Sequence, residues 1–267
     1  QKKADRSYFE IASNQIPATI EKILDAAIRS GIPARDIQVL APMYRGAAGI
    51  DAINQLMQEL LNPLQKGQIS FEASQFQYRS GDKVIHLVND AEVNVFNGDL
   101  GYITDLIPGK YTESKQDEMM IDFDGNEVVY PRNEWYKIRL AYAMSIHKSQ
   151  GSEFPVVFLP ITSASKRMLE RNLIYTAITR AKSKLILLGE LQAFDYATKH
   201  IGTARKTYLI ERFSDLTESS EELNEPILET ENQIDPHQPY ILTEDNWTSI
   251  PAMIGISQDD LDEFFGK

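Results

Sequence analysis

The residues best suited to chemistry lie in one short stretch, residues 145–154, with the sequence SIHKSQGSEF. Apolar runs precede and follow it, at residues 138–144 and 156–159, so we predict a strand, one or two helical turns and a second strand. Ser145 is a typical helix N-cap, and Gly151 is a typical residue just beyond a helix C-terminus. The N-terminus of a helix presents unpaired N–H groups, which suit an anionic oxygen such as that of a phosphate.

Three side chains of this stretch add charge or polarity. His147 and Lys148 belong to the expected helix, and Glu153 lies just past the glycine, on the way into the next strand. On spacing alone, an ordinary surface turn with chance polar residues explains the stretch as well as a phosphate-binding turn does.

A second candidate is Arg180, which we expect on a helix over residues 168–181. Apolar residues at helical spacing cover roughly half of its circumference; they are Leu169, Leu173, Ile174, Ala177, Ile178 and Ala181. Arg180 falls at one edge of this apolar face, one turn beyond Thr176. That position suits an arginine at a domain boundary, although an ordinary boundary salt bridge would use it equally well.

A third candidate is the loop that follows a predicted strand. Residues 37–41 form a short apolar run typical of a buried strand, and the sequence PMYRG follows directly. In parallel α/β folds, ligands bind beyond the carboxyl ends of the strands. Arg45 and Gly46 therefore occupy a position typical of a binding loop, and a plain surface charge is the alternative for Arg45.

The elements that must position these residues alternate between strand and helix. We predict a strand at residues 7–12, a helix with its apolar face at residues 20–28, the strand at 37–41 and a helix over 50–61. This alternation indicates a parallel α/β domain. It resumes near residue 135 and continues with a strand at 184–189 and a helix that begins near residue 194.

Between about residues 68 and 135 the pattern changes to short strands with tight turns. Asn97-Gly98 and Asp124-Gly125 are strong hairpin signals. We predict strands at residues 83–88, 93–96, 100–106, 119–123 and 127–130. Such a succession indicates a small antiparallel barrel inserted into the α/β domain.

The net charge of −12 is unevenly distributed along the chain. Residues 214–267 hold 14 acidic residues and one lysine, which leaves 25 acidic and 26 basic residues before them. The folded part is therefore near neutral, and the overall acidity does not exclude a groove for an anionic ligand. Residues 214–239 lack aromatic side chains, so we predict a disordered tail, and hydrophobic residues return after it.

Composition narrows the remaining possibilities. The chain has no cysteine, which fits a reducing compartment and a cytoplasmic protein, and its four histidines are too scattered for a metal site. No apolar run approaches ~20 residues, so we expect no transmembrane helix and no membrane partner. The polar start without an initiator methionine indicates that the chain begins within a longer protein.

Two motifs together carry a family resemblance. SIHKSQGSEF resembles motif V of superfamily 1 helicases in its RecD-like, 5′-to-3′ form, and NLIYTAITRAK, residues 172–182, resembles motif VI. The two stand in the order and at a separation typical of that family. The segment GDKVIHLVND, followed by VFNGDLG, is similar to the SH3-like barrel that RecD-like helicases insert in their second motor domain. The resemblance covers residues 7–213 and leaves the tail out.

This resemblance implies a fold and an activity. Residues 1–67 and 136–213 would form the second RecA-like motor domain, a parallel-sheet α/β domain interrupted by an SH3-like β-barrel at residues 68–135 and followed by a disordered acidic tail at 214–267. The protein would be an ATP-dependent helicase that translocates on single-stranded DNA and unwinds duplexes, in DNA repair or recombination. The direction of translocation comes from the family alone.

The resemblance also implies roles for the candidate residues. Arg180 would be the catalytic arginine finger on the γ-phosphate, and Gln150, Gly151 and Glu153 would join it on the nucleotide side. Contacts to DNA would come from Arg45, Gly46, Ser145, His147 and Lys148. Ser145 departs from the commoner threonine of the motif but keeps a hydroxyl group.

What the sequence lacks is equally informative. No G-x-x-x-x-G-K-[ST] occurs, so no P-loop is present to hold nucleotide phosphates. The resemblance places that loop, and the ligands of the Mg²⁺ that accompanies ATP, in an N-terminal motor domain beyond this sequence. We therefore expect this chain alone to be inactive, with no metal ligands of its own.

The expected partners are single-stranded DNA, junctions of single- and double-stranded DNA, the N-terminal motor domain of the same protein, and a partner protein that docks on the tail. The alternative function is a non-catalytic DNA- or protein-binding module with a degenerate motor fold.

Overall fold

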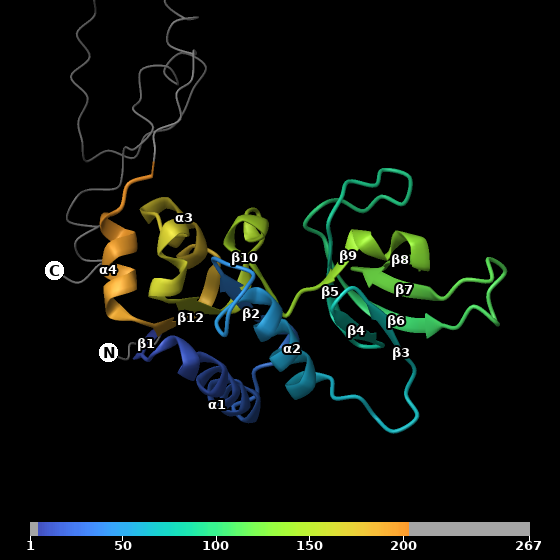
Figure 1. The fold of residues 1–267 in the computed structure, drawn as a ribbon, viewed down its shortest axis with the longest axis horizontal. Helices are drawn as coiled ribbons and strands as arrows, with labels where there is room; N and C mark the ends of the chain where they lie inside the picture. The colour runs from blue at the N-terminus through green and yellow to red at the C-terminus, as the bar shows by residue number, and fades with distance from the viewer. Residues whose placement is uncertain (1–4, 203–267) are drawn as a thin grey trace, which may run out of the picture. The chain divides into compact units, whose positions relative to one another are not determined.

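The computed structural model describes residues 5–202. One of its two five-stranded sheets is parallel, with the strand order β1-β12-β11-β2-β10 (Figure 1). In chain order, these strands span Arg6–Glu10 (β1), Ile37–Ala41 (β2), Ala143–Ser145 (β10), Phe154–Ile161 (β11) and Ala181–Gly189 (β12). The predicted parallel α/β architecture is confirmed.

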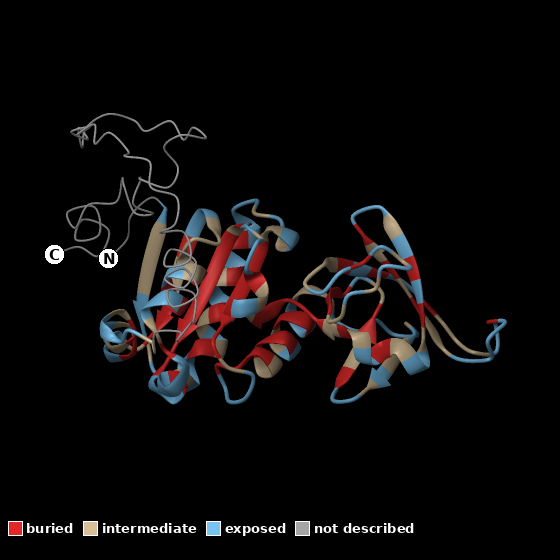
Figure 2. Cartoon of the chain, turned by 90° about the horizontal axis from the view of Figure 1, so that it is seen from above, coloured by how far each residue is buried: buried red, intermediate tan, exposed pale blue. Residues whose placement is uncertain are grey.

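Helices cover both faces of this sheet. On one face, α1 (Ile16–Arg29) and α2 (Ile50–Leu61) share an apolar cluster with Val39. On the other, α3 (Arg171–Ile178) and α4 (Leu191–Lys199) share a second cluster with Leu40. Because the side chains of successive residues in a strand point to opposite faces of the sheet, β2 contributes residues to both clusters and is buried along its whole length. Figure 2 shows buried residues running along the strands of this sheet.

The antiparallel strands follow α2 in the chain. One sheet has the order β8-β7-β6-β5-β9, and β3 and β4 form a separate hairpin. The strands span Ser70–Ala73 (β3), Phe76–Arg79 (β4), Lys83–His86 (β5), Leu100–Ile107 (β6), Glu118–Phe123 (β7), Asn126–Pro131 (β8) and Ile138–Leu140 (β9). Asp124 and Gly125 join β7 to β8 with positive φ angles of 54° and 91°, as a tight hairpin requires.

Short 3-10 helices complete the chain between these elements. They span Ser13–Gln15 (η1), Ala34–Asp36 (η2), Arg132–Lys137 (η3), Ile146–Ser149 (η4) and Ser163–Met168 (η5). Two of them, η4 and η5, follow strands of the parallel sheet and carry residues of the sites described below.

Three predicted elements are divided or absent in the structure. The strand expected at residues 138–144 is two strands, β9 and β10, which belong to different sheets, because the chain crosses from one sheet to the other at Ala141 and Tyr142. Residues 93–96 form no strand; Val95 makes only an isolated bridge with Asp90. The helix expected over 168–181 is interrupted: η5 ends at Met168, α3 ends at Ile178, and β12 begins at Ala181.

One buried carboxylate joins the antiparallel strands to α2. Asp82, which is fully buried, accepts hydrogen bonds from the side chains of Gln58 (2.5 Å), Asn62 (2.8 Å) and Tyr142 (3.0 Å) and from the backbone N–H of Arg79 (2.8 Å). Burial raises the pKa of the Asp82 carboxyl above its usual range. These bonds converge on one residue from three segments that are far apart in the sequence.

Within residues 5–202, no helix is long and apolar enough to cross a bilayer. The predicted acidic tail at residues 214–267, with the hydrophobic stretch expected to dock on a partner, lies outside the described residues.

Candidate functional site

The two candidate DNA-binding segments follow neighbouring strands and leave the sheet at the same edge. Strand β10 pairs with β2 in parallel, and Ser145, the last residue of β10, is opposite Ala41, the last residue of β2. The loop with Arg45 and Gly46 therefore begins beside the segment with His147 and Lys148. The structure thus brings together residues that are about 100 positions apart in the sequence.

The loop between β2 and α2 is tightly wound. The backbone N–H groups of Ile50 and Asp51 donate to the carbonyl oxygens of Met43 (3.0 Å) and Tyr44 (3.1 Å). A Cβ atom on Gly49 would lie 2.5 Å from the carbonyl oxygen of Arg45, so only glycine fits at that position. This winding leaves Arg45 and Gly46 exposed at the edge of the sheet.

The segment after β10 is held from within. The Ser145 side chain accepts a hydrogen bond from the backbone N–H of Lys148 (3.3 Å), as predicted for an N-cap. Gly151 has a φ of 86°, a left-handed conformation typical of the residue just past a helix end. However, η4 is a single 3-10 turn whose capped N–H is already satisfied, so a phosphate at this segment would be contacted by side chains more than by a helix terminus.

Two side chains of η4 are available at this edge. His147 is exposed, and Lys148 is partly buried. The Nζ atom of Lys148 donates to the Asn97 side-chain oxygen at 3.1 Å. Burial, assisted by the positive charge of Arg139, lowers the pKa of Lys148. We read Asn97-Gly98 in the sequence as a hairpin signal only, and no sequence pattern pointed to its contact with Lys148.

The candidate nucleotide-side residues gather at the opposite end of the strands. Phe154 of β11 pairs with Ala181 of β12, and the Phe154 N–H donates to the Arg180 carbonyl oxygen at 2.8 Å. Arg180 lies in the turn between α3 and β12, because α3 ends two residues before it. The predicted place at the edge of an apolar helix face is therefore wrong, because Arg180 is not on the helix, but Arg180 does contact the Gly151–Glu153 segment.

The Arg180 guanidinium is held by three hydrogen bonds. Its Nε donates to the Thr176 carbonyl (3.1 Å), one Nη to the Ser152 carbonyl (3.0 Å) and the other Nη to the Thr179 hydroxyl (3.1 Å). A guanidinium carries five N–H groups, so two remain for an outside acceptor. The predictions from the sequence did not include Thr179 or the Ser152 carbonyl as partners of this arginine.

The other nucleotide-side candidates are exposed near Arg180. Gln150, Gly151 and Glu153 all face solvent. The Glu153 carboxylate lies 3.3 Å from the Lys182 Nζ, and both side chains are 56% exposed. Such an exposed ion pair contributes little to stability, so the carboxylate remains available to a ligand hydroxyl.

The two sets of residues are separated along the strands but joined through the core. Phe158 of β11 and Ala143 of β10 both pair with Val39 of β2, which gives a common reference point along the strands. Phe154 lies four residues before this point, and Ser145 lies two residues after it. At ~3.3 Å per residue the separation is about 20 Å. The connecting segment is anchored by Ile146, which is fully buried in one apolar cluster with Leu173, Ile174 and Ala177 of α3.

Among residues 5–202, no three histidine, cysteine, aspartate or glutamate side chains lie close enough to hold a metal ion.

Comparisons with known proteins bear directly on this arrangement. Residues 140–188, which include β10, η4, β11, α3 and most of β12, match the UvrD-like helicase C-terminal domain. Residues 53–123 match the SH3 domain of ATP-dependent RecD-like DNA helicases. The chain resembles RecD-like superfamily 1 helicases. The resemblance expected from SIHKSQGSEF and NLIYTAITRAK is thereby confirmed, since both motifs lie within the first of these matches.

Full-length RecD-type proteins show the same similarity. The chain is 36% identical over 176 residues to the ATP-dependent RecD2 DNA helicase of Deinococcus radiodurans, a match that covers 66% of this chain and 23% of that protein. It is 29% identical over 152 residues to the RecBCD enzyme subunit RecD of Mycolicibacterium smegmatis, covering 57% of this chain and 25% of the relative. The chain thus spans about a quarter of the length of these RecD-type relatives.

Proposed function

We propose that this chain is the C-terminal motor portion of an ATP-dependent DNA helicase that translocates on single-stranded DNA and unwinds duplexes. The observation that carries the proposal is the parallel pairing of Ser145 with Ala41, which sets two candidate DNA-binding loops side by side. On this view the α/β part is the second RecA-like motor domain and the antiparallel part is its SH3-like insertion. The relatives' names support ATP and DNA as ligands.

The DNA side uses cationic and polar groups at the carboxyl edge of the sheet. Arg45, His147 and Lys148 would contact phosphates, and Ser145 would keep η4 in the conformation that presents them. Lys148 donates to Asn97 in the absence of DNA, so a phosphate would replace that neutral acceptor by a charged one. A charge-assisted hydrogen bond is roughly twice as strong as a neutral one, which favours the exchange.

The nucleotide side uses Arg180 and the segment that touches it. ATP with Mg²⁺ would bind in a cleft against the N-terminal motor domain, which would supply the P-loop and the metal ligands. Arg180 would direct its two unused N–H groups at the γ-phosphate, where developing negative charge in the transition state is stabilised. Gln150 and Gly151 would line the same side, and Glu153 would accept a hydrogen bond from the ribose.

Coupling between the two sides follows from the rigid connection. Arg180 holds the Ser152 carbonyl, and Ile146 is packed on α3, so η4 and Arg180 belong to one packed unit. A movement of Arg180 toward a nucleotide would therefore carry η4, and the DNA contacts on it, in the same direction. Closure and reopening of the cleft would change the grip on DNA, which is what stepping along one strand requires.

The test compares the full-length protein with this chain alone. We expect ATP hydrolysis stimulated by single-stranded DNA, and unwinding of a duplex with a 5′ single-stranded tail, from the full-length protein. We expect neither from the isolated chain, which lacks a P-loop. Hydrolysis by the isolated chain at the full-length rate would contradict the assignment to a second motor domain.

The non-catalytic binding module makes a different prediction. It requires DNA binding by the full-length protein without any stimulation of ATP hydrolysis. Three parts of the proposal rest on the family resemblance alone: the direction of translocation, a role in DNA repair or recombination, and a partner protein at the tail. A strand-displacement assay with 5′- and 3′-tailed substrates tests the direction of translocation.

A further inference from the structure

A third basic loop lies at the same edge of the sheet as the two candidate DNA-binding loops. It is η5, which follows β11, and β11 pairs with β2 on the side away from β10. Since Phe158 pairs with Val39, β11 ends at Ile161 about one residue beyond the level at which β2 ends. The loops after β10, β2 and β11 therefore follow one another in a row.

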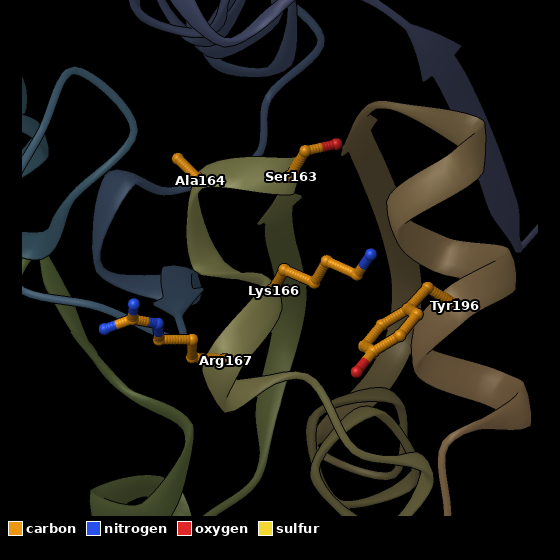
Figure 3. Close-up of a pocket in the computed structure, with 5 residues that line it drawn as sticks. All are labelled: Ser163, Ala164, Lys166, Arg167 and Tyr196. Atoms are coloured by element: carbon orange, nitrogen blue, oxygen red, sulfur yellow. The ribbon is translucent and has the colours of Figure 1, made fainter.

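The third loop carries two cations and borders a hollow. Lys166 and Arg167 are both exposed, and together with Ser163, Ala164 and Tyr196 they line a pocket of about 500 Å³. Figure 3 shows the two basic side chains leaving η5 in opposite directions, Lys166 toward Tyr196 and Arg167 away from it. The Lys166 ammonium lies over the Tyr196 ring, 4.6 Å from its centroid.

The backbone of this loop is fixed, so the loop presents Arg167 in a defined place. Glu190, next after β12, accepts hydrogen bonds from the Ser163 backbone N–H (3.1 Å) and from the Ser163 hydroxyl. The buried Ser165 donates from its hydroxyl to the Thr162 carbonyl at 2.7 Å. The Ser163 hydroxyl is thereby used inside the protein and is not offered to a ligand.

Among the arginines of residues 5–202, Arg167 belongs, with Arg35, Arg45 and Arg171, to those whose side chains have no hydrogen-bond or ion-pair partner. Arg29, Arg79, Arg132 and Arg139 all lie in ion pairs. Within residues 5–202, neither Arg167 nor Arg45 has a side-chain hydrogen bond or an ion pair. An exposed, unpaired guanidinium that projects from a fixed loop suits a bidentate phosphate contact.

We propose that Arg167, with Lys166 beside it, is a further phosphate-binding position for the single strand that crosses the loops after β10 and β2. This inference rests on the proposed function and extends its DNA path by one loop. Neighbouring strands lie ~4.8 Å apart, and a strand with stacked bases rises ~3.4 Å per nucleotide along its axis, so the added loop accommodates one or two more nucleotides.

The experiment measures binding of labelled oligothymidylate to the full-length protein by fluorescence anisotropy over a range of salt concentrations. Arg167→Gln is expected to weaken binding about 3- to 10-fold at ~0.1 M salt and to reduce the slope of log K against log salt by ~0.7. Arg167→Lys, which keeps the charge, is expected to retain most of the slope. Lys22→Gln removes an exposed charge from α1 and is the matched control, with no expected change.

A series of oligonucleotide lengths supplies a second readout. As the oligonucleotide is lengthened, the affinity of the wild-type protein is expected to rise over one or two more nucleotides than the affinity of Arg167→Gln does. An unchanged salt slope and an unchanged length dependence in Arg167→Gln would overturn the inference. Arg45→Gln and Lys148→Gln distinguish a failure of this inference from a failure of the proposed function. If they weaken DNA binding while Arg167→Gln does not, only this inference fails. If none of the three substitutions weakens binding, the proposed DNA-binding edge fails as well.

Discussion

One Nη atom of Arg180 donates a hydrogen bond to the Ser152 carbonyl oxygen at 3.0 Å. The two residues come from different motifs, 28 positions apart in the sequence. This bond fixes the segment that leads from the candidate DNA loop to the arginine that would face the nucleotide. A ligand that draws Arg180 outward must therefore also disturb the backbone of the Gly151–Glu153 segment.

Replacement of Arg180 by alanine in the full-length protein should reduce ATP turnover by ~10³-fold or more, because arginine fingers contribute ~10³–10⁵ in other phosphoryl-transfer systems. Affinity for single-stranded DNA should stay within a few-fold, since Arg180 lies about 20 Å along the strands from the DNA edge. Steady-state phosphate release and anisotropy measure the two quantities.

The matched control is Arg171→Ala, which removes an exposed arginine from α3, the helix that precedes the Arg180 turn. It should leave turnover unchanged. Normal hydrolysis by Arg180→Ala, or an unfolded circular dichroism spectrum, would remove the basis for the finger role.

Lys148→Gln should weaken binding to single-stranded DNA and lower its salt dependence by ~0.7 in slope, because one phosphate contact is lost. Asn97→Ala should leave DNA affinity unchanged or tighter, since it removes the residue that competes for the Lys148 ammonium. Weaker binding by Asn97→Ala would show instead that Asn97 positions the lysine or contacts DNA itself.

Glu153→Gln should raise the KM for ATP several-fold and leave DNA affinity within about twofold, because the carboxylate is a better acceptor for a ribose hydroxyl than an amide is. Lys182→Gln is the control, since it breaks the same exposed ion pair while it keeps the carboxylate. Equal effects of the two substitutions would assign the change to the ion pair and not to the acceptor.

Stability should fall in mild acid because of His86. This side chain is fully buried; its Nδ1 lies 2.8 Å from the Val88 carbonyl, and its Nε2 is buried without a partner. Burial lowers the pKa of His86, against smaller raising effects of the Val88 hydrogen bond and of the Asp90 charge. The folded protein then binds fewer protons than the unfolded chain, so stability is lost as pH falls below about 6.5, the usual pKa of an unfolded histidine.

Thermal unfolding followed by the fluorescence of Trp135, in a Trp247→Phe background, measures this effect in the antiparallel part. The midpoint should be lower at pH 5.5 than at pH 7.5, and His86→Gln should show a smaller difference between the two pH values. A pH dependence that is the same in wild type and variant would assign it to other groups.

Loss of the Asp82 carboxylate should loosen the antiparallel strands from α2. Asp82→Ala leaves the buried hydroxyl of Tyr142 without its acceptor. It also removes one of two acceptors from each of the amides of Gln58 and Asn62, which keep the carbonyl oxygens of Gln77 and Ser80. The loss of a partner by a buried polar group costs about 1–3 kcal/mol, so the free energy of unfolding, measured with urea, should fall by several kcal/mol in total. Asp105→Ala, an exposed residue in β6, should shift it by less than about 0.5 kcal/mol. A similarly small change in the free energy of unfolding for Asp82→Ala would contradict the proposed role of Asp82 in holding the antiparallel strands to α2.

Local sequence determined the parts of this protein whose conformation depends on neighbours along the chain. The β2 strand and the α2 helix have the predicted bounds, because a short apolar run and a helical apolar repeat each specify one conformation. The Ser145 cap, the Gly151 turn and the Asp124-Gly125 hairpin were predictable for the same reason. The amino-acid sequences of the two motifs were sufficient to predict the resemblance to RecD-like helicases.

Tertiary structure decided whatever depends on which strands pair. The apolar run 138–144 is divided between two sheets, which no periodicity records, since both halves are buried and extended. Strand register paired Ser145 with Ala41, so the loop that carries Arg45 begins beside Ser145, and it separated this end of the strands from Arg180. The side-chain partner of Lys148 is 51 positions away, and those of Asp82 are 20, 24 and 60 positions away. The free energy of such contacts is gained only once the intervening chain has folded.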